Sequence, residues 1–119
     1  MRFPSDAPVT PQKLDALRVR IVRLGIAMDR VEEQFIRASG PGGQKVNKTE
    51  SGVRLTYALG EQPIAVKWTR ERSRALNRFL ALRELVDEIE VRVSPETSER
   101  VADAERRRKQ KDRLRRRSL

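Results

Sequence analysis

Hydrophobic residues recur at helical spacing near the start of the chain, with basic residues on the other faces. The apolar positions are Leu14, Leu17, Ile21 and Leu24. Thr10 is a suitable helix cap, Pro11 suits a first helical position, and Gly25 is typical of a helix end. We therefore predict an N-terminal helix over 10–25. A strand over 17–24 remains an alternative, because apolar and basic residues also alternate there.

Alternating apolar and polar residues predict three short strands after this helix. The first covers 31–38 and contains β-branched and aromatic residues. The other two are 53–57 and 64–68, and the glycine and proline of 60–63 supply the turn between them, which is a hairpin pattern. A short helical turn over 46–51 is compatible with the residues between the first two strands.

A second helix is predicted after the hairpin, with Ser73 as its cap. Its apolar positions are Leu76, Phe79, Leu80, Leu82, Val86 and Ile89. This apolar face would cover the sheet. Asp87, Glu88 and Glu90 lie near the C-terminal end, where the helix dipole disfavours acids, so we expect them to have another purpose. The predicted fold is α+β, a single small domain with a short mixed β-sheet covered by a C-terminal helix.

The composition divides the chain into four segments. Prolines and polar residues make 1–9 a flexible arm, and 10–25 is the N-terminal helix. Residues 26–93 form the domain around the sheet. Residues 94–119 are a basic tail with little apolar material, which we expect to be either disordered or a lone solvated helix.

Charge and missing residue types limit the function. The chain of 119 residues has a net charge of +10 and a pI of about 11.1, so nucleic acid or an anionic surface is the expected partner. It has no histidine and no cysteine, which excludes a Ser-His-Asp or Cys-His site and a histidine-based zinc site. We expect no metal and no cofactor. No apolar run approaches the ~20 residues that span a bilayer, so no membrane partner is expected.

The run Gly40–Thr49, here named the glycine-rich segment, has the residues of a loop that presents its own backbone to a partner. Its glycines allow a close approach of the chain, and its proline restricts one dihedral angle. Lys45 and Lys48 beside Gln44 indicate that the partner carries phosphates. In a chain without histidine or cysteine, this segment is the best candidate for a catalytic element.

The residues 35–49 resemble the GGQ signature of class-I peptide-chain release factors. The resemblance continues in 52–56 and in 70–78, which includes a Glu-Arg-Ser segment, and covers about 30–85. A single GGQ domain with a basic tail is similar to the small codon-independent ribosome-rescue hydrolases. The mitochondrial release-factor-in-rescue group and its bacterial relatives resemble it most, and the alternative rescue factor B type is a near neighbour. We expect no codon-reading domain.

The resemblance implies hydrolysis of the peptidyl-tRNA ester on the large ribosomal subunit. It implies a projecting loop in which Gly42, Gly43 and Gln44 are catalytic, with the Gln44 N–H stabilising the developing negative charge. It also implies that Gln44 is a site for N5-methylation by a glutamine methyltransferase. The alternative is a non-enzymatic rRNA-binding module that docks through the loop and the tail.

Polar and basic residues beside the loop and in the tail are predicted to bind RNA. They are Arg37, Lys45, Asn47, Lys48, Arg70, Arg72, Arg74, Arg78, Arg106, Arg107, Arg108, Lys109, Lys111, Arg113, Arg115, Arg116 and Arg117. For Arg72, an ion pair with Glu71 or Glu84 is an equally good interpretation. Trp68 and Tyr57 are interpreted as packing residues of the sheet rather than as a platform for stacked bases.

The expected partners are large-subunit rRNA and P-site peptidyl-tRNA. A helper rescue protein is compatible with the resemblance, and we expect a monomer. The expected location is the cytoplasm of a bacterial-type cell, with an organelle as the alternative. An intact stalled ribosome and a split large subunit fit the residues equally well.

Overall fold

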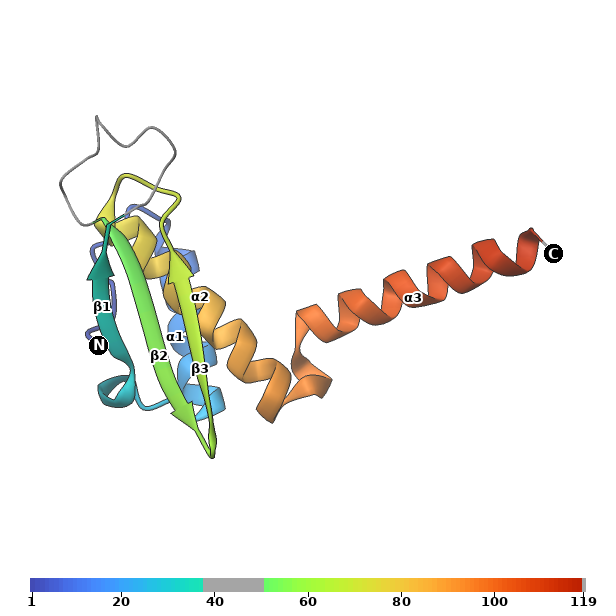
Figure 1. The fold of residues 1–119 in the computed structure, drawn as a ribbon, viewed down its shortest axis with the longest axis horizontal. Helices are drawn as coiled ribbons and strands as arrows, with labels where there is room; N and C mark the ends of the chain where they lie inside the picture. The colour runs from blue at the N-terminus through green and yellow to red at the C-terminus, as the bar shows by residue number, and fades with distance from the viewer. Residues whose placement is uncertain (38–50, 119) are drawn as a thin grey trace.

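The sheet consists of antiparallel strands (Figure 1). The computed structural model describes residues 1–37 and 51–118. Within them the strands are β1 (Glu32–Ile36), β2 (Gly52–Leu59) and β3 (Gln62–Trp68), in the order β1-β2-β3. Both pairings are antiparallel, so the α+β class is confirmed and the expectation of a mixed sheet is wrong. Parallel neighbours need a crossover connection, usually a helix, and the described helices precede or follow the sheet instead.

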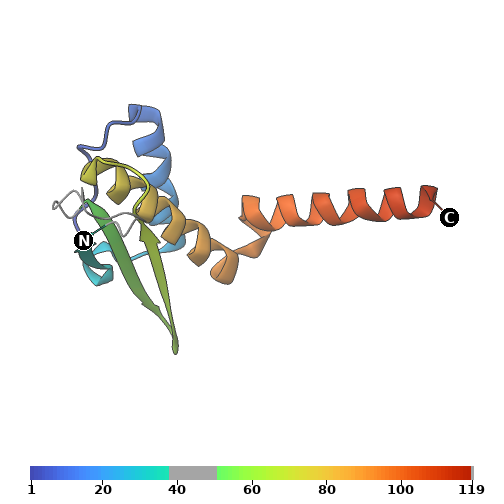
Figure 2. The same ribbon diagram turned by 45° about the horizontal axis from the view of Figure 1, so that its top comes forward.

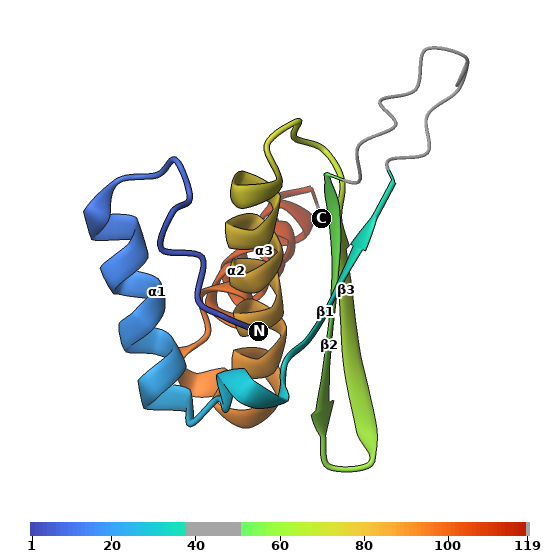
Figure 3. The ribbon, with the colours of Figure 1, turned by 90° about the vertical axis from the view of Figure 1, so that its left-hand side faces the viewer.

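One face of the sheet packs on α2 (Arg74–Val93), as the sequence predicted. The sheet contributes Val53, Leu55, Tyr57, Ile64 and Val66 to the core, and α2 contributes Phe79, Leu82, Leu85, Val86 and Ile89. Each fully buried aliphatic or aromatic side chain contributes about 1.5–3 kcal/mol relative to exposure. Figure 3 shows α2 lying between the sheet and α1, so the body has three layers. Ser73 caps α2 by accepting a hydrogen bond from the Leu76 N–H at 3.2 Å.

The N-terminal helix, α1 (Pro11–Leu24), is confirmed, and the alternative strand over 17–24 is wrong. The Thr10 side chain accepts a hydrogen bond from the Lys13 N–H. Gly25 ends the helix with a φ of 68°, a left-handed conformation that favours glycine. The buried residues Leu17 and Ile21 are four positions apart and face α2. Their helical spacing, rather than the alternation of apolar and basic residues, therefore matches the buried side of this segment.

The first nine residues pack on the body and do not form the free arm that their composition suggested. Pro4 and Ala7 are buried. The terminal amino group of Met1 donates to the carbonyl oxygens of Met28 and Val31, each at 2.9 Å, where a short 3-10 helix, η1 (Met28–Arg30), leads into β1. Burial of apolar groups and these hydrogen bonds offset the flexibility expected from the prolines.

The basic tail contains a long helix that projects from the body. It begins after a short 3-10 helix, η3 (Pro95–Thr97), and α3 spans Glu99–Arg117. Figures 1 and 2 show α3 leaving the body at the C-terminal end of α2 and extending away from it. Of the two expectations for the tail, the structure shows the solvated helix. None of the described helices is long and apolar enough to cross a membrane.

Candidate nucleic-acid interface

The predicted catalytic residues Gly42, Gly43 and Gln44 lie outside the described residues, and so does most of the helical turn expected over 46–51. Three of the predicted RNA-binding residues, Lys45, Asn47 and Lys48, lie there too. The structure does describe the base from which this part of the chain leaves and returns. At that base Ile36, the last residue of β1, pairs with Gly52, the first residue of β2.

Gly52 is needed at the base because other groups come too close for a side chain. A Cβ atom placed there would lie 2.8 Å from Cγ2 of Thr69 and 2.9 Å from both Cγ1 and the carbonyl oxygen of Ile36. Such distances require the backbone to move. The tight packing of Ile36, Gly52 and Thr69 therefore fixes the spacing of all three strands where the glycine-rich segment is attached.

Asn77 of α2 joins the base to the connection between β3 and α2. Its side chain is fully buried, and its amide nitrogen donates to the carbonyl oxygens of Ser51 at 2.7 Å and Glu71 at 2.8 Å. Its amide oxygen accepts from the Glu71 N–H at 3.1 Å. One buried amide thus ties three segments together, and its hydrogen bonds offset the cost of burying it. The signal in the sequence was a polar residue on the apolar face of a predicted helix.

Two arginine–aromatic pairs flank the same base. Phe35 and Trp68 lie on either side of Val53 in one row across the sheet. The guanidinium of Arg74 lies 4.2 Å from the ring centre of Phe35, and that of Arg70 lies 5.2 Å from that of Trp68. Such contacts are worth about 0.5–1 kcal/mol at exposed sites and orient the arginine. The base therefore presents two oriented guanidinium groups.

The aromatic residues of the sheet pack as predicted. Tyr57 is buried, and its hydroxyl accepts a hydrogen bond from the Ala27 N–H at 3.3 Å. Trp68 is half-buried beneath Arg70. Neither ring is laid open as a platform for bases.

Arg78, which was predicted to bind RNA, has an internal role instead. Its Nε donates to Glu33 at 2.7 Å and its Nη2 donates to the carbonyl oxygen of Arg2 at 2.6 Å. The side chain is only 15% exposed. It joins α2, β1 and the N-terminal segment, so its charge is not available to a partner.

Two other predicted cations near the base are exposed. Arg37 follows β1, and Arg72 lies between β3 and α2. The interpretation of Arg72 as the partner of Glu84 is wrong, because Glu84 pairs with Arg100 at 2.7 Å.

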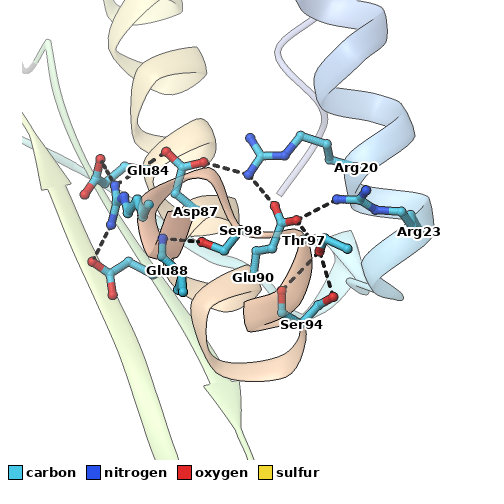
Figure 4. A network of polar contacts seen from close by, with 11 residues as sticks. Arg20, Arg23, Glu84, Asp87, Glu88, Glu90, Ser94, Thr97 and Ser98 are labelled. Carbon is cyan, nitrogen blue, oxygen red and sulfur yellow. Dashed lines mark hydrogen bonds and ion pairs between the residues drawn. The ribbon is translucent and has the colours of Figure 1, made fainter. Parts of the chain in front are cut away.

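A cluster of acids and arginines, here named the acid–arginine junction, connects α1, α2, η3 and α3. Its members are Arg20, Arg23, Glu84, Asp87, Glu88, Glu90, Thr97 and Arg100. Figure 4 shows Arg20 and Arg23 of α1 pointing toward Glu90 of α2. Arg20 lies 2.8 Å from Glu90 and 2.7 Å from Asp87, and Arg23 lies 2.7 Å from Glu90. Asp87 and Glu90 therefore hold α1 against α2, and Glu88 pairs with Arg100 of α3, which confirms that these acids have another purpose.

Glu90 is the buried centre of this junction, with 3% of its side chain exposed. Burial raises the pKa of Glu90, but the hydrogen bond from Thr97 and the hydrogen bonds and charges of Arg20 and Arg23 outweigh it. The pKa of Glu90 therefore lies below its ordinary value, and the carboxylate stays ionised.

Arg100 fastens the first turn of α3 to α2. Its guanidinium lies 2.7 Å from Glu84, 3.0 Å from Glu88 and 3.4 Å from Asp87. Burial lowers the pKa of Arg100, and the hydrogen bond and charge of Glu84 raise it by more. The guanidinium of Arg100 therefore stays protonated. Nothing in the local sequence pattern points to Arg100, because its partners lie on another helix.

Beyond this attachment, α3 is exposed on every side. Its free cations, here named the α3 basic residues, are Arg107, Arg108, Lys109, Lys111, Arg113, Arg115, Arg116 and Arg117. At 100° per residue they occupy the whole circumference of the helix. Within the described chain, none has a carboxylate within 4 Å, whereas Arg106 pairs with Asp103 of its own helix. Such a helix suits surroundings that carry phosphates on several sides.

Comparison with known proteins agrees with these features. A family model described as the RF-1 domain matches residues 20–118. The chain is 44% identical over 71 residues to the mitochondrial translation release factor in rescue of Danio rerio, a match covering 60% of this chain. It is 34% identical over 90 residues to the protein of the same name from Homo sapiens, covering 76% of this chain. It is 47% identical over 53 residues to a peptide chain release factor homolog of Escherichia coli, covering 44% of this chain.

The matches cover only part of these relatives. They span 44% of the Danio rerio protein, 53% of the Homo sapiens protein and 25% of the Escherichia coli protein. The family model, in contrast, covers nearly all of this chain, from the middle of α1 to the end of α3. The protein therefore belongs to the RF-1 domain family of peptide-chain release factors.

Proposed function

We propose that this protein rescues stalled ribosomes by hydrolysing the ester of P-site peptidyl-tRNA without reading a codon. The observation that carries the proposal is the pairing of two parts in one small chain. A firmly built loop base adjoins the glycine-rich segment, and a separate helix presents on all sides cations that form no ion pair with the described residues. The likeness to two proteins named as release factors in rescue supports the choice of rescue over codon-directed termination.

The proposed reaction adds water to the ester carbonyl of peptidyl-tRNA. The water oxygen bonds to the carbonyl carbon, and the carbonyl oxygen becomes negative. The bond to the ribose oxygen then breaks, and that oxygen takes up a proton. A backbone N–H of Gln44 directed at the negative oxygen would stabilise it, and one such donor is worth about 3–4 kcal/mol in other enzymes. The side chain of Gln44 would help to admit the water and exclude larger nucleophiles, and Gln44→Ala would remove this second role. Gly42 and Gly43 would let the backbone approach the ester without a Cβ in the way.

Binding would come from two separate groups of cations. Arg37, Arg70, Arg72 and Arg74 surround the loop base and would contact RNA near the ester. The α3 basic residues would enter a groove or channel lined with rRNA or left empty by mRNA. If α3 neutralises six or more phosphates, affinity should fall on the order of 10³-fold between about 50 and 200 mM salt.

The experiment is a release assay with substoichiometric protein. Ribosomes stalled at the end of an mRNA without a stop codon, and large subunits that carry peptidyl-tRNA, are the two substrates. We expect repeated turnover on at least one of them, and little release by Gly43→Ala or Gln44→Ala proteins that still bind. Binding without release from either substrate would contradict the proposal and identify a non-enzymatic RNA-binding module.

Three further expectations depend on this function. N5-methylation of Gln44 by a glutamine methyltransferase is checked by the intact mass of protein purified from its natural source. A helper rescue protein is checked by adding cell extract to the release assay. The proposed location is that of the bacterial or organellar ribosome on which the protein acts.

A further inference from the structure

The face of the sheet opposite α2 is not covered by any described element, as Figure 3 shows. Here it is named the open face. Its side chains, at alternate positions of the three strands, are Glu32, Gln34, Ile36, Arg54, Thr56, Ala58, Pro63, Ala65 and Lys67. Most of them are polar or small, and all except the half-buried Ile36 and Thr56 are exposed. The open face thus has no aromatic residue, and its apolar residues Ile36 and Pro63 lie at strand ends, whereas most protein interfaces have aromatic or large apolar residues at their centre.

Two cations lie directly opposite each other on the open face. Arg54 of β2 pairs in register with Lys67 of β3, and neighbouring strands are only about 4.7–4.9 Å apart. Both side chains are exposed, and no carboxylate of the described residues forms an ion pair with either. The one strand acid on this face, Glu32, is opposite Thr56, in the next row from Arg54.

This arrangement is unfavourable for the isolated protein. Like charges directly opposite in an antiparallel pair repel each other, and threonine or valine at either position would suit a strand better. The core does not require either cation, because both point away from α2. An anion bound between them would remove the repulsion, and it would be held by the fork of arginine and the point charge of lysine.

We infer that the open face is an RNA-binding surface on which Arg54 and Lys67 hold a backbone phosphate. The inference rests on the proposed function, which brings the protein into surroundings of rRNA and tRNA. The row that contains Gln34, Arg54 and Lys67 is next to the row of Ile36 and Gly52 at the loop base. The phosphate would therefore be bound beside the loop base, on the side of the sheet away from α1 and α2.

Reversing the charge of Lys67 distinguishes phosphate binding by the open face from a general effect of surface charge. Lys67→Glu replaces the repulsion with attraction to Arg54, so the midpoint of thermal unfolding should rise by about 1–4 °C. The same protein should bind stalled ribosomes about tenfold more weakly, and the slope of log affinity against log salt should fall by about one. Lys13→Glu on α1 is the matched control, with the same change of charge on another face. Equal affinities of the two variants would overturn the inference.

Site-directed cleavage tests whether RNA lies at this face. The chain has no cysteine, so a single Ala65→Cys on the open face can carry a tethered iron chelate that produces hydroxyl radicals. We expect cuts in rRNA or tRNA from this position and a different pattern from Val22→Cys on exposed α1. Cuts confined to ribosomal protein, or none, would overturn the inference.

The two proposals fail in distinguishable ways. If the wild-type protein releases peptide but Lys67→Glu binds as tightly as Lys13→Glu, the open face is not an RNA surface and the proposed function stands. If Lys67→Glu binds more weakly and the wild-type protein releases no peptide, the RNA surface stands and hydrolysis is wrong.

Discussion

The arginines of the acid–arginine junction and the basic residues of α3 differ in what surrounds their charge. Arg20, Arg23 and Arg100 each lie within 3.0 Å of at least one carboxylate oxygen. The α3 basic residues have no such partner within the described chain and are exposed. Each residue of either set adds one positive charge to the net charge of +10.

The difference shows that net charge alone does not locate a binding surface. An arginine that is paired inside the fold joins elements of the protein, and Arg78 is a further example. An unpaired arginine on a solvated helix does little for the fold and remains available to phosphates. We therefore assign stability to the junction and binding to α3, and each assignment can be tested separately.

Removal of residues 106–119 should have the largest effect. Affinity for stalled ribosomes should fall on the order of 10³-fold near physiological salt, because six or more phosphate contacts are lost. The thermal unfolding midpoint of the body should stay within about 2 °C, since the α3 basic residues make no contact with the core. Fluorescence anisotropy measures the affinity for ribosomes, and calorimetry measures the unfolding midpoint. Undiminished binding would show that α3 is not the anchor.

Glu90→Ala should lower the stability of the fold, whereas removal of residues 106–119 should lower the affinity for ribosomes. The free energy of unfolding should fall by about 2–4 kcal/mol, because a buried carboxylate is lost and Arg20 and Arg23 remain without it. Chemical denaturation measures the loss. Glu88→Ala, two positions away in a more exposed ion pair, is the control and should cost less than about 1 kcal/mol. A similar small loss for both would mean that the junction does not stabilise the fold.

The same carboxylate gives the junction a pH dependence. The pKa of Glu90 is lower in the folded protein than its ordinary 4.5, so the stabilisation is complete above about pH 4.5 and is lost as the pH falls through the folded value. Stability of the wild-type protein should therefore fall more steeply on acidification below pH 4.5 than that of Glu90→Gln. Parallel curves for the two proteins would contradict the assignment.

Asn77→Ala extends the comparison to the loop base, where a neutral group rather than an ion pair joins the segments. We expect a loss of about 2–4 kcal/mol, because backbone groups of Ser51 and Glu71 lose their hydrogen-bond partner and a cavity remains where the Asn77 amide was buried. Peptide release should also slow at concentrations of protein that saturate the ribosome. Gln110→Ala on exposed α3 is the control, with a change below about 0.5 kcal/mol. Full stability of Asn77→Ala would show that the base does not depend on this amide.

Arg100→Gln should have the smallest effect on stability, below about 1 kcal/mol, since the side chains in its ion pairs are 28–40% exposed. It should instead loosen α3 relative to the body. Spin labels on Val22→Cys and Gln110→Cys can measure this, because the chain has no other cysteine. The distance distribution should broaden in Arg100→Gln and not in Arg107→Gln. Identical distributions would mean that Arg100 does not orient α3.

Local patterns in the sequence were sufficient for most of the fold. The caps at Thr10, Gly25 and Ser73 and the alternation in 53–57 and 64–68 predicted helices and strands that the structure confirms. These features depend on neighbours a few positions apart. The packing of residues 1–9 and the antiparallel order of the sheet were missed, because they depend on distant contacts.

The same limit applies to the candidate site. The exposed cations of α3 followed from composition, since that segment has few apolar residues to bury. Arg78, however, resembled the arginines near it, and only the fold places Glu33 beside it, 45 positions away. Arg20 and Glu90, which are 70 positions apart, show the same dependence on tertiary structure.

The central claim is that the glycine-rich segment performs the chemistry and α3 provides the binding. The most direct test is the rate of peptide release from stalled ribosomes as a function of protein concentration. Gln44→Ala should lower the maximal rate at least tenfold and leave the half-saturating concentration unchanged. Removal of residues 106–119 should raise the half-saturating concentration and leave the maximal rate unchanged. The claim is contradicted if both changes lower the maximal rate alike, or if Gln44→Ala releases peptide at the wild-type rate.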